Sequence, residues 1–271
     1  RILLQAAPDH LRAPEALLGA HVLTRRAEVF PLLVKYLDAN DSLSVQVHPD
    51  DAYALAHEGE LGKTEMWYVL HADPDATLIA GLREGVTREE FQRALALGHP
   101  ADLLHRLPVK TGDALLIPAG RIHALLPGLL ILEIQENSDT TYRLYDWDRP
   151  GLDGQPRPLH IEQAMAVANW ADYQVQPVVE RVELLGINRR SQLAACEYFV
   201  VDKYVLAGEC VFAFPGDRFH ILNCVAGRAA LTWTGGSELL HYGDSMLIPA
   251  SLPDFSLEPD GSASFLISYV P

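Results

Sequence analysis

The chain contains Gly112-Asp113-Ala114-Leu115-Leu116-Ile117-Pro118-Ala119, and a closely similar stretch follows later as Gly243-Asp244-Ser245-Met246-Leu247-Ile248-Pro249-Ala250. In each copy an apolar run lies between a Gly-Asp pair and a Pro-Ala pair, which is the pattern of a short strand bounded by turns. Recurrence of such a stretch indicates that a β unit has been duplicated. We therefore expect two related β barrels.

Short apolar runs separated by turn residues surround both copies. In the first half they cover residues 43–48, 65–71, 76–81, 113–117, 122–126 and 129–136, and in the second half residues 181–187, 193–206, 210–214, 217–225, 229–233, 238–241, 245–249 and 263–270. Many short strands of this kind are typical of a jelly roll or barrel. The sequence therefore predicts a mainly β chain with two jelly-roll barrels in tandem and helical insertions.

The helical insertions have their own patterns. Residues 10–40 show helix-like periodicity, and residues 30–37 within them fit a buried strand equally well. Residues 87–104 form an amphipathic segment that begins with a capping box of Thr87 and Glu90. We expect a helix in both segments.

These patterns divide the chain into three parts. We expect an N-terminal metal-binding domain at residues 1–155, with a helical insertion at about 86–106. Residues 156–178 form a connecting segment whose helical pattern covers 158–170. A C-terminal β domain without metal ligands follows at residues 179–271.

Composition limits the class of protein. A chain of 271 residues that is 49% hydrophobic can bury a substantial core without disulfides. Its formal charge of −15 argues against binding to nucleic acid or to an anionic membrane, because both attract basic surfaces. No apolar run approaches the roughly 20 residues that span a bilayer. We expect a soluble protein with no nucleic-acid or membrane partner.

The cysteines indicate a compartment. Cys196, Cys210 and Cys224 are odd in number, have no metal-binding spacing and follow no apolar signal segment. We therefore expect buried, reduced thiols and a cytoplasmic location. The chain begins with Arg1 rather than Met, so we also expect that an N-terminal piece is missing.

Three motifs supply side chains that can bind a metal. Gln46 and His48 are two residues apart in a strand pattern, so both side chains leave the sheet on one face. Glu65 opens an apolar strand, where an unpaired carboxylate would be costly, and His123 follows a tight Pro-Ala-Gly turn. A single histidine near a strand end is usually a hydrogen-bonded or surface residue. The combination of the four residues favours a metal site over that simpler interpretation.

The donor types indicate which metal would bind. Imidazoles and a carboxylate suit a divalent first-row ion, and an amide oxygen is an unusual but competent addition. Zinc is our first choice. An oxygen-rich set can expand beyond four positions, so we expect an open catalytic site. The second copy of the repeat continues as Ser251-Leu252-Pro253-Asp254-Phe255 and lacks these ligands.

A second group of polar residues follows the last strand of the first half. Residues 133–149 combine alternating acids, a polar turn and a further strand-like stretch. For Glu133 and Arg143 we favour a functional role. Ion pairs on an exposed strand edge are the better explanation for four further charged residues, which are Glu136, Asp146, Asp148 and Arg149.

Four motifs occur in order along the chain: Leu43-Ser44-Val45-Gln46-Val47-His48-Pro49-Asp50-Asp51, Gly62-Lys63-Thr64-Glu65-Met66-Trp67-Tyr68, Ile117-Pro118-Ala119-Gly120-Arg121-Ile122-His123 and Gln135-Glu136-Asn137-Ser138-Asp139-Thr140-Thr141-Tyr142-Arg143. Together they resemble type I mannose-6-phosphate isomerase, in the short bacterial branch of that cupin family. The resemblance runs from about residue 14 to the C-terminus. The family normally begins with a further segment containing a Trp-Gly-Gly motif, which is absent here.

The resemblance implies a fold, a site and a reaction. The fold would be two double-stranded β-helix barrels of the cupin type, with one zinc ion per chain bound by Gln46, His48, Glu65 and His123. Arg143 would be a principal catalytic residue, and the pocket would be lined by the further catalytic residues Lys63, Glu133 and Asp139. The reaction would be zinc-dependent aldose-ketose isomerisation between mannose-6-phosphate and fructose-6-phosphate through an enediolate.

This reaction assigns chemical tasks to the residues. A proton must move between C2 and C1 of the sugar, and the base is open among Glu133, Asp139 and a metal-bound water. Arg143 would stabilise the enediolate and help to bind the substrate, while Lys63 would attract the phosphate or polarise an oxygen. Ser44 would donate to the phosphate or to a hydroxyl, although a strand serine bonded to a neighbour is an equally good interpretation.

Two other functions fit the same barrel. A metal-dependent cupin oxygenase would use the ligands for iron, and a non-catalytic sugar-phosphate-binding cupin would need the pocket but not Arg143.

Lys35 is best interpreted as a solvated lysine at a helix end. For the isomerase we expect a hexose-6-phosphate substrate, and the chain is either a monomer or a homodimer.

Overall fold

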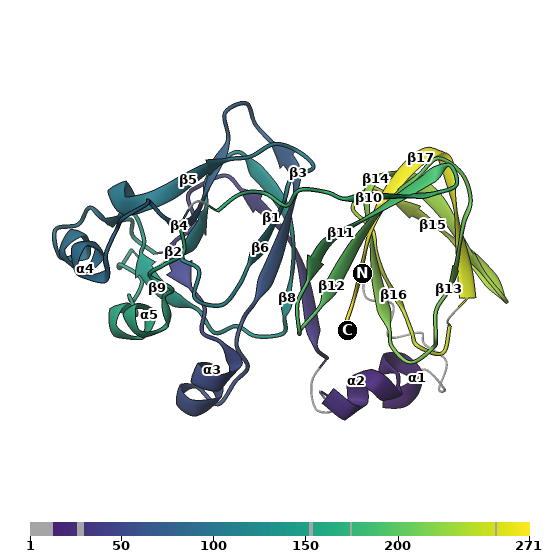
Figure 1. The fold of residues 1–271 in the computed structure, drawn as a ribbon, viewed down its shortest axis with the longest axis horizontal. Coiled ribbons are helices and arrows are strands. Elements are labelled where there is room, and N and C mark those ends of the chain that lie inside the picture. The colour runs from purple at the N-terminus through teal and green to yellow at the C-terminus, as the bar shows by residue number, and fades with distance from the viewer. Residues whose placement is uncertain (1–12, 26–29, 152–153, 174, 253) are drawn as a thin grey trace. The chain divides into compact units, whose positions relative to one another are not determined.

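The computed structural model describes residues 13–25, 30–151, 154–173, 175–252 and 254–271. The chain folds into two compact units, one formed by Leu32–Val178 and the other by Arg1–Pro31 together with Val179–Pro271. Strands dominate both units (Figure 1), so the mainly β class that the sequence predicts is confirmed.

Two antiparallel sheets form the unit Leu32–Val178. The first sheet has the strand order β1 (Leu32–Ala39), β8 (Leu129–Glu136), β3 (Glu65–Ala72) and β6 (Ala114–Ile117). The second has the order β5 (Leu104–Pro108), β4 (Thr77–Leu82), β7 (His123–Leu125), β2 (Val45–Val47) and β9 (Tyr142–Tyr145). Strands that are distant in the sequence are therefore neighbours, which brings the four motifs into one unit.

The apolar core of this unit comes from both sheets. Trp67 of β3, Ile131 of β8 and Leu78 of β4 belong to one buried cluster. Alternate residues of a strand share a face, so a run such as Trp67 and Val69 points inward while its neighbours point away. A second buried cluster contains Phe91 from a helix beside the sheets.

Three α-helices of the described chain belong to this unit: α3 (Asp51–His57), α4 (Arg88–Ala96) and α5 (Ile161–Val167). The helix α5 lies within the predicted segment 158–170. The sequence prediction missed α3, whose signal is Asp50, since the Asp50 side chain accepts a hydrogen bond from the Tyr53 amide.

The capping box of α4 is present as predicted. The Thr87 hydroxyl accepts from the Glu90 amide at 3.2 Å, and the Glu90 carboxylate accepts from the Thr87 amide at 2.9 Å. The predicted helix is nevertheless too long, because α4 ends at Ala96. A 3-10 turn at Pro100–Leu103 and then strand β5 follow.

The second unit contains α1 (Pro14–Leu18), α2 (Ala20–Arg25) and one sheet. Its strand order is β10 (Val182–Leu185), β11 (Asn188–Ala195), β12 (Val200–Leu206), β17 (Asp254–Tyr269), β14 (His220–Trp233) and β15 (Gly236–His241), with β13 (Cys210–Ala213) paired to β17 and β16 (Ser245–Ile248) paired to β14. Its core includes Leu222, Leu257 and Phe265.

Several of the expected strands in this unit have different bounds. The expected run 193–206 is divided between β11 and β12, while the expected runs 217–225 and 229–233 fall mostly within the single strand β14, which begins at His220. The strand continues because bulges absorb the irregularity at Gly227, which has a φ of +69°. A Cβ atom there would lie 2.1 Å from the Ser262 carbonyl oxygen, so only glycine fits.

The repeated stretch occupies corresponding strands in the two units. In β6, Ile117 lies opposite Glu65 of β3, and in β16, Ile248 lies opposite His220 of β14. The duplication therefore extends to strand pairing. The number of closed barrels stays a prediction.

The compact units have other bounds than the domains expected at 1–155, 156–178 and 179–271. Residues near the N-terminus belong with the C-terminal strands, since the Leu17 and Leu18 carbonyls accept hydrogen bonds from the amides of Ala250 and Phe219. The expected connecting segment belongs instead to the unit Leu32–Val178, where α5 packs against β9 and β2. Residues 10–12 and 26–29 of the helical pattern lie outside the described residues.

None of the helices in the described ranges has the length and apolar character needed to cross a bilayer. Cys224 is buried and Cys210 is half-buried, and both are free thiols.

Candidate metal centre

His48, Glu65 and His123 converge on one point in the unit Leu32–Val178. Their potential ligand atoms all lie within 4.8 Å of one another, and all three side chains are buried. His48 Nε2 is 3.2 Å from Glu65 Oε1, and His123 Nε2 is 3.8 Å from Glu65 Oε2. This is the one group of three or more His, Cys, Asp or Glu side chains with such geometry among the described residues.

Strand pairing explains the convergence. Glu65 begins β3 and His123 begins β7, while His48 directly follows β2. Gln46 of β2 lies opposite His123 in the strand register, and its amide nitrogen is 3.3 Å from His123 Nε2. A half-turn of the amide exchanges its nitrogen and oxygen, so Gln46 can present an oxygen to the same point.

Backbone carbonyls orient both imidazoles. His48 Nδ1 is 3.1 Å from the Thr140 carbonyl oxygen, and His123 Nδ1 is 2.9 Å from the Arg121 carbonyl oxygen. A carbonyl only accepts, so each Nδ1 carries the proton and each Nε2 lone pair faces the cluster. Histidines that bind metals have this type of outer partner in most proteins.

Electrostatics keep the imidazoles neutral and the carboxylate charged. Burial lowers the pKa of His48, and burial together with His48 lowers the pKa of His123 to about 3. Burial alone would raise the pKa of Glu65, but the nearby His48 and Lys63 outweigh it and hold that pKa well below its usual range. Neutral imidazoles and an ionised carboxylate are the states that bind a metal ion.

The cluster leaves polar atoms without hydrogen bonds. Glu65 Oε1 forms an ion pair with Lys63 Nζ at 2.9 Å, whereas His48 Nε2 and Glu65 Oε2 have no hydrogen-bond partner among the described residues. Buried polar atoms are rarely left in this state, because each costs on the order of 1–3 kcal/mol. A divalent cation would satisfy both atoms, so the donor set fits a metal ion.

A second buried carboxylate lies beside the cluster. Glu133 accepts from Trp67 Nε1 at 2.9 Å and pairs with Lys35 Nζ at 3.3 Å. The Trp67 indole in turn meets the His123 ring edge to face, with centroids 5.3 Å apart. Burial, followed by the charge of Glu65, raises the pKa of Glu133 to about 7.

The interpretation of Lys35 as a solvated helix-end residue is wrong. Lys35 lies in β1, opposite Glu133 of β8, and also donates to the Gln135 side chain at 2.6 Å. The ambiguity between helix and strand over residues 30–37 concealed this position. Lys35 stands in a nearly continuous apolar run, which carries no alternation that would have indicated its pairing with Glu133.

Arg143 lies in β9, directly opposite Gln46 in the strand register. Its Nη1 donates to the Pro158 carbonyl at 2.8 Å, while its buried Nε has no partner among the described residues. Burial, followed by the neighbouring charge of Arg157, lowers its pKa. Pairing with Gln46 puts Arg143 on the strand next to the cluster.

The remaining predicted site residues divide by burial. Ser44 and Lys63 are buried, with 5% and 6% of their surface exposed, whereas Asp139 is exposed. Lys63 contacts Glu65 as described above. Among the described residues, no hydrogen bond or ion pair joins Asp139 to His48, Glu65 or His123.

Two residues assigned to an exposed strand edge are in fact buried. The Glu136 carboxylate accepts from the Thr64 amide at 2.8 Å, next to the start of β3. Asp146 accepts from Arg157 Nε at 2.6 Å and from Arg149 Nε at 3.1 Å. Glu136 therefore holds the backbone next to β3, while Asp146 forms the expected type of ion pair but as a buried residue rather than at a solvated edge.

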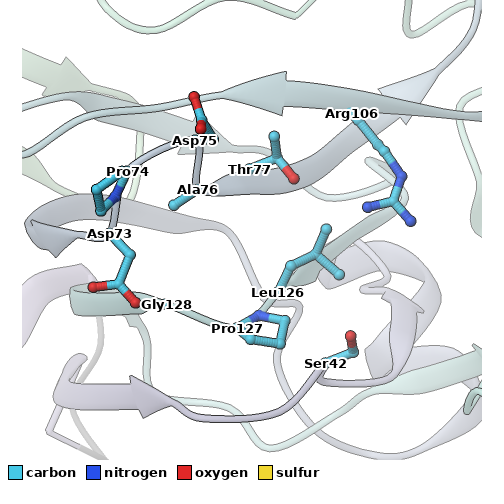
Figure 2. A pocket seen from close by; sticks show the side chains of 10 residues that line it. All are labelled: Ser42, Asp73, Pro74, Asp75, Ala76, Thr77, Arg106, Leu126, Pro127 and Gly128. Atoms are coloured by element: carbon cyan, nitrogen blue, oxygen red, sulfur yellow. The ribbon is translucent and has the colours of Figure 1, made fainter.

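Surface cavities lie elsewhere in the unit. Figure 2 shows the larger of two such cavities, of about 330 Å³, which Asp73 and Asp75 line on one side and Arg106 on the other. A smaller cavity of about 220 Å³ borders Gly120, in the turn before β7. None of the predicted metal-binding or catalytic residues lines either cavity.

A pair of sheets with a buried His-Glu-His cluster at the strand ends, which could hold a metal ion, is a cupin type of site. Two family models match the sequence: the catalytic domain of type I phosphomannose isomerase over residues 9–75, and the cupin domain of mannose-6-phosphate isomerase over residues 189–270.

Individual relatives agree with these models. The chain is 43% identical over 246 residues to the probable mannose-6-phosphate isomerase GmuF of Bacillus subtilis, covering 89% of this chain and 76% of the relative. It is 40% identical over 235 residues to the mannose-6-phosphate isomerase of Streptococcus mutans, covering 87% of this chain and 73% of that relative. The solved mannose 6-phosphate isomerase from Bacillus subtilis matches with a TM-score of 0.83 and 35% identity, over 92% of this chain and 78% of that one. The chain belongs to the type I mannose-6-phosphate isomerase family.

Proposed function

We propose that the chain interconverts mannose-6-phosphate and fructose-6-phosphate as a zinc-dependent aldose-ketose isomerase. The observation that carries the proposal is the buried cluster of His48, Glu65 and His123, in which His48 Nε2 and Glu65 Oε2 have no hydrogen-bond partner among the described residues. Membership of the isomerase family supplies the reaction class.

The proposed ligands are Gln46, His48, Glu65 and His123, which would hold one zinc ion per chain. Two nitrogens with a carboxylate and an amide oxygen suit zinc, and the absence of a thiolate among these four residues leaves a set that can expand. When bound, zinc supplies a positive charge that polarises an oxygen of the sugar.

Glu133 is the proposed proton carrier between C1 and C2. A carboxyl group with a pKa of about 7 is suited both to accept and to donate a proton near neutral pH. Its contacts with Trp67 and Lys35 fix its position. Asp139, the alternative base, is exposed and is the weaker candidate.

Positive side chains would offset the charges of the substrate. Arg143 is proposed to stabilise the negative charge that develops on the enediolate oxygen, because a guanidinium retains its charge at any working pH. Lys63 and Ser44, both buried near the cluster strands, are proposed to bind sugar or phosphate oxygens.

The working enzyme is proposed to act in the cytoplasm on hexose-6-phosphates, as a monomer or a homodimer. The N-terminal β domain would hold the metal, while the C-terminal β domain carries none of the proposed ligands. The strongly acidic net charge supports a small-molecule substrate over a nucleic acid.

A coupled assay tests the proposal. Purified protein is given mannose-6-phosphate, and fructose-6-phosphate is measured before chelation, after chelation and after zinc is returned. We expect turnover that disappears with the chelator and recovers with zinc. Turnover that persists in metal-free protein would contradict the metal assignment, and bound iron with consumption of oxygen would favour an oxygenase instead.

A further inference from the structure

The orientation of His123 depends on a backbone carbonyl that belongs to Arg121. His123 Nδ1 donates to this carbonyl at 2.9 Å, which leaves Nε2 to face Glu65 and Gln46. Movement of the carbonyl by a fraction of an ångström would turn the imidazole, since the Nδ1 hydrogen bond fixes the ring plane. The side chain of Arg121 is therefore of interest even though it faces away from the cluster.

That side chain is fixed by three hydrogen bonds. Arg121 Nε and Nη2 donate to the two carboxylate oxygens of Asp172, each at 2.8 Å, and Nη1 donates to the Leu116 carbonyl at 2.6 Å. The Arg121 and Asp172 side chains are only 15% and 13% exposed. A two-pronged, largely buried pair of this kind is stronger and more directional than a surface ion pair.

Asp172 is itself held by the neighbouring backbone. Its carbonyl accepts from the Leu82 amide at 2.9 Å, and nearby the Asn169 amide donates to the Gly120 carbonyl at 2.8 Å. Gly81 permits this close approach, because a Cβ atom there would lie 2.5 Å from the Asp172 carbonyl oxygen. The segment containing Asp172 is thus tied both to β4 and to the turn that precedes His123.

We propose that the Arg121–Asp172 ion pair is a positioning element that sets the His123 ring for metal binding, although the contact with His123 is made by the Arg121 backbone carbonyl and not by either side chain. The proposal rests on the proposed metal site, and it assigns a specific role to two residues 51 positions apart. Loss of the pair would free the Arg121 carbonyl and weaken zinc binding by roughly 10–100-fold, the usual effect of removing an outer partner of a ligand.

The test measures zinc affinity by competition with a chromophoric chelator in Asp172→Ala, Asp172→Asn and Arg121→Lys proteins. We expect a roughly 10–100-fold weaker affinity in both Asp172 variants. The zinc affinity of Arg121→Lys should lie between that of the Asp172 variants and that of the unchanged protein, because lysine keeps the charge but not the two-pronged geometry. Cobalt substituted for zinc should show an altered visible absorption spectrum, which reports the geometry around the ion.

A matched control separates positioning from general stability. Arg190 and Asp202 form an ion pair at 2.8 Å in the other compact unit, with Asp202 buried. Asp202→Asn should lower the unfolding temperature but leave the zinc affinity within about twofold of the unchanged protein. An unchanged zinc affinity and cobalt spectrum in folded Asp172→Asn or Arg121→Lys protein would overturn the proposal.

Failure of the proposed function gives a different result. If the unchanged protein bound no zinc, the metal assignment would fail, and the NMR signal of the His123 Nδ1 proton in that protein would still test the positioning element. We expect this signal to be sharp in the unchanged protein and lost in Asp172→Asn. A signal that persists in the variant would show that the carbonyl does not need the ion pair.

Discussion

Two buried carboxylates in the unit Leu32–Val178 have different surroundings. Glu65 faces two imidazoles, and its pKa lies well below the usual range. Glu133 faces an indole and a lysine, and its pKa is raised to about 7. The same functional group is thus prepared by its environment either to stay charged or to exchange a proton.

This difference gives a prediction for a pair of isosteric substitutions. Glu65→Gln should weaken zinc binding by more than about 100-fold and abolish turnover, because it removes the charged ligand. Glu133→Gln should keep its zinc and lower kcat by roughly 10²–10⁴-fold, as expected for loss of a general base. Zinc content and steady-state kinetics of both proteins provide the measurement. Loss of zinc from Glu133→Gln would place that residue among the ligands instead.

Arg143 gives a second prediction. Arg143→Lys should keep its zinc but lose at least about tenfold in kcat, because the ammonium cannot reproduce the planar donor set of the guanidinium. Metal analysis beside the coupled assay checks it. A variant with unchanged kcat would remove Arg143 from the proposed chemistry.

The strand β4 depends on a single glycine for its contact with the segment that carries Asp172. Gly81 has a φ of +75°, and a Cβ atom would collide with the Asp172 backbone. Gly85, in the loop that follows, has a φ of +84° but nothing within 4 Å of its Cβ position. An alanine would adopt an unfavourable positive φ at either position, but only at position 81 would its Cβ atom also collide with neighbouring backbone.

We therefore predict different effects of the same substitution. Gly85→Ala should destabilise the protein by about 1 kcal/mol, from the left-handed backbone alone. Gly81→Ala should cost more than about 2 kcal/mol, since the neighbouring backbone must also move. Denaturant unfolding of the two variants measures both values. Equal decreases in the free energy of unfolding would mean that the Asp172 backbone moves away from β4 at little cost.

Elements with strong local signals were predicted well. The Thr87 and Glu90 capping box fixes where α4 begins, and apolar runs bounded by turn residues identified β3 and β8. The helix α3 and the strand β5 were missed because their patterns are short. Continuity of β14 through Gly227 could not be foreseen, since it depends on bulges paired with a distant strand.

The same limit applies to the site. Gln46, His48, Glu65 and His123 stand in recognisable motifs, so their convergence was predictable. Lys35 was misassigned because its role requires knowing that β1 pairs with β8. Burial of Asp146 by two arginines likewise depends on contacts that residue spacing does not reveal.

The stability of the whole chain should depend on His220, which occupies in β14 the register position that Glu65 has in β3. His220 is buried and stacks on Phe214, with ring centroids 3.7 Å apart. Burial, followed by the charge of Arg218, lowers its pKa from 6.5 to about 4, while Asp217 opposes the shift. Between these two pKa values, His220 is therefore neutral in the folded chain and protonated in the unfolded chain.

The sign of the pH effect follows from linkage. Above pH 6.5 the ring is neutral in both states, and as the pH falls to about 4 only the unfolded state gains the proton, so up to about 3 kcal/mol of stability is lost. His220→Phe should reduce this loss while keeping an aromatic partner for Phe214. Unfolding free energies at the two ends of this pH window provide the check. The same pH dependence in both proteins would assign the loss to other groups.

The proposed binding of one zinc ion by two imidazoles, a carboxylate and an amide can be tested most directly by X-ray absorption at the zinc edge of the purified protein. The account predicts about one zinc per chain, with nitrogen and oxygen neighbours at about 2.0–2.2 Å, the outer-shell signature of two imidazoles and no sulfur. A protein without stoichiometric zinc, or a spectrum with a sulfur neighbour or without imidazole, would contradict it.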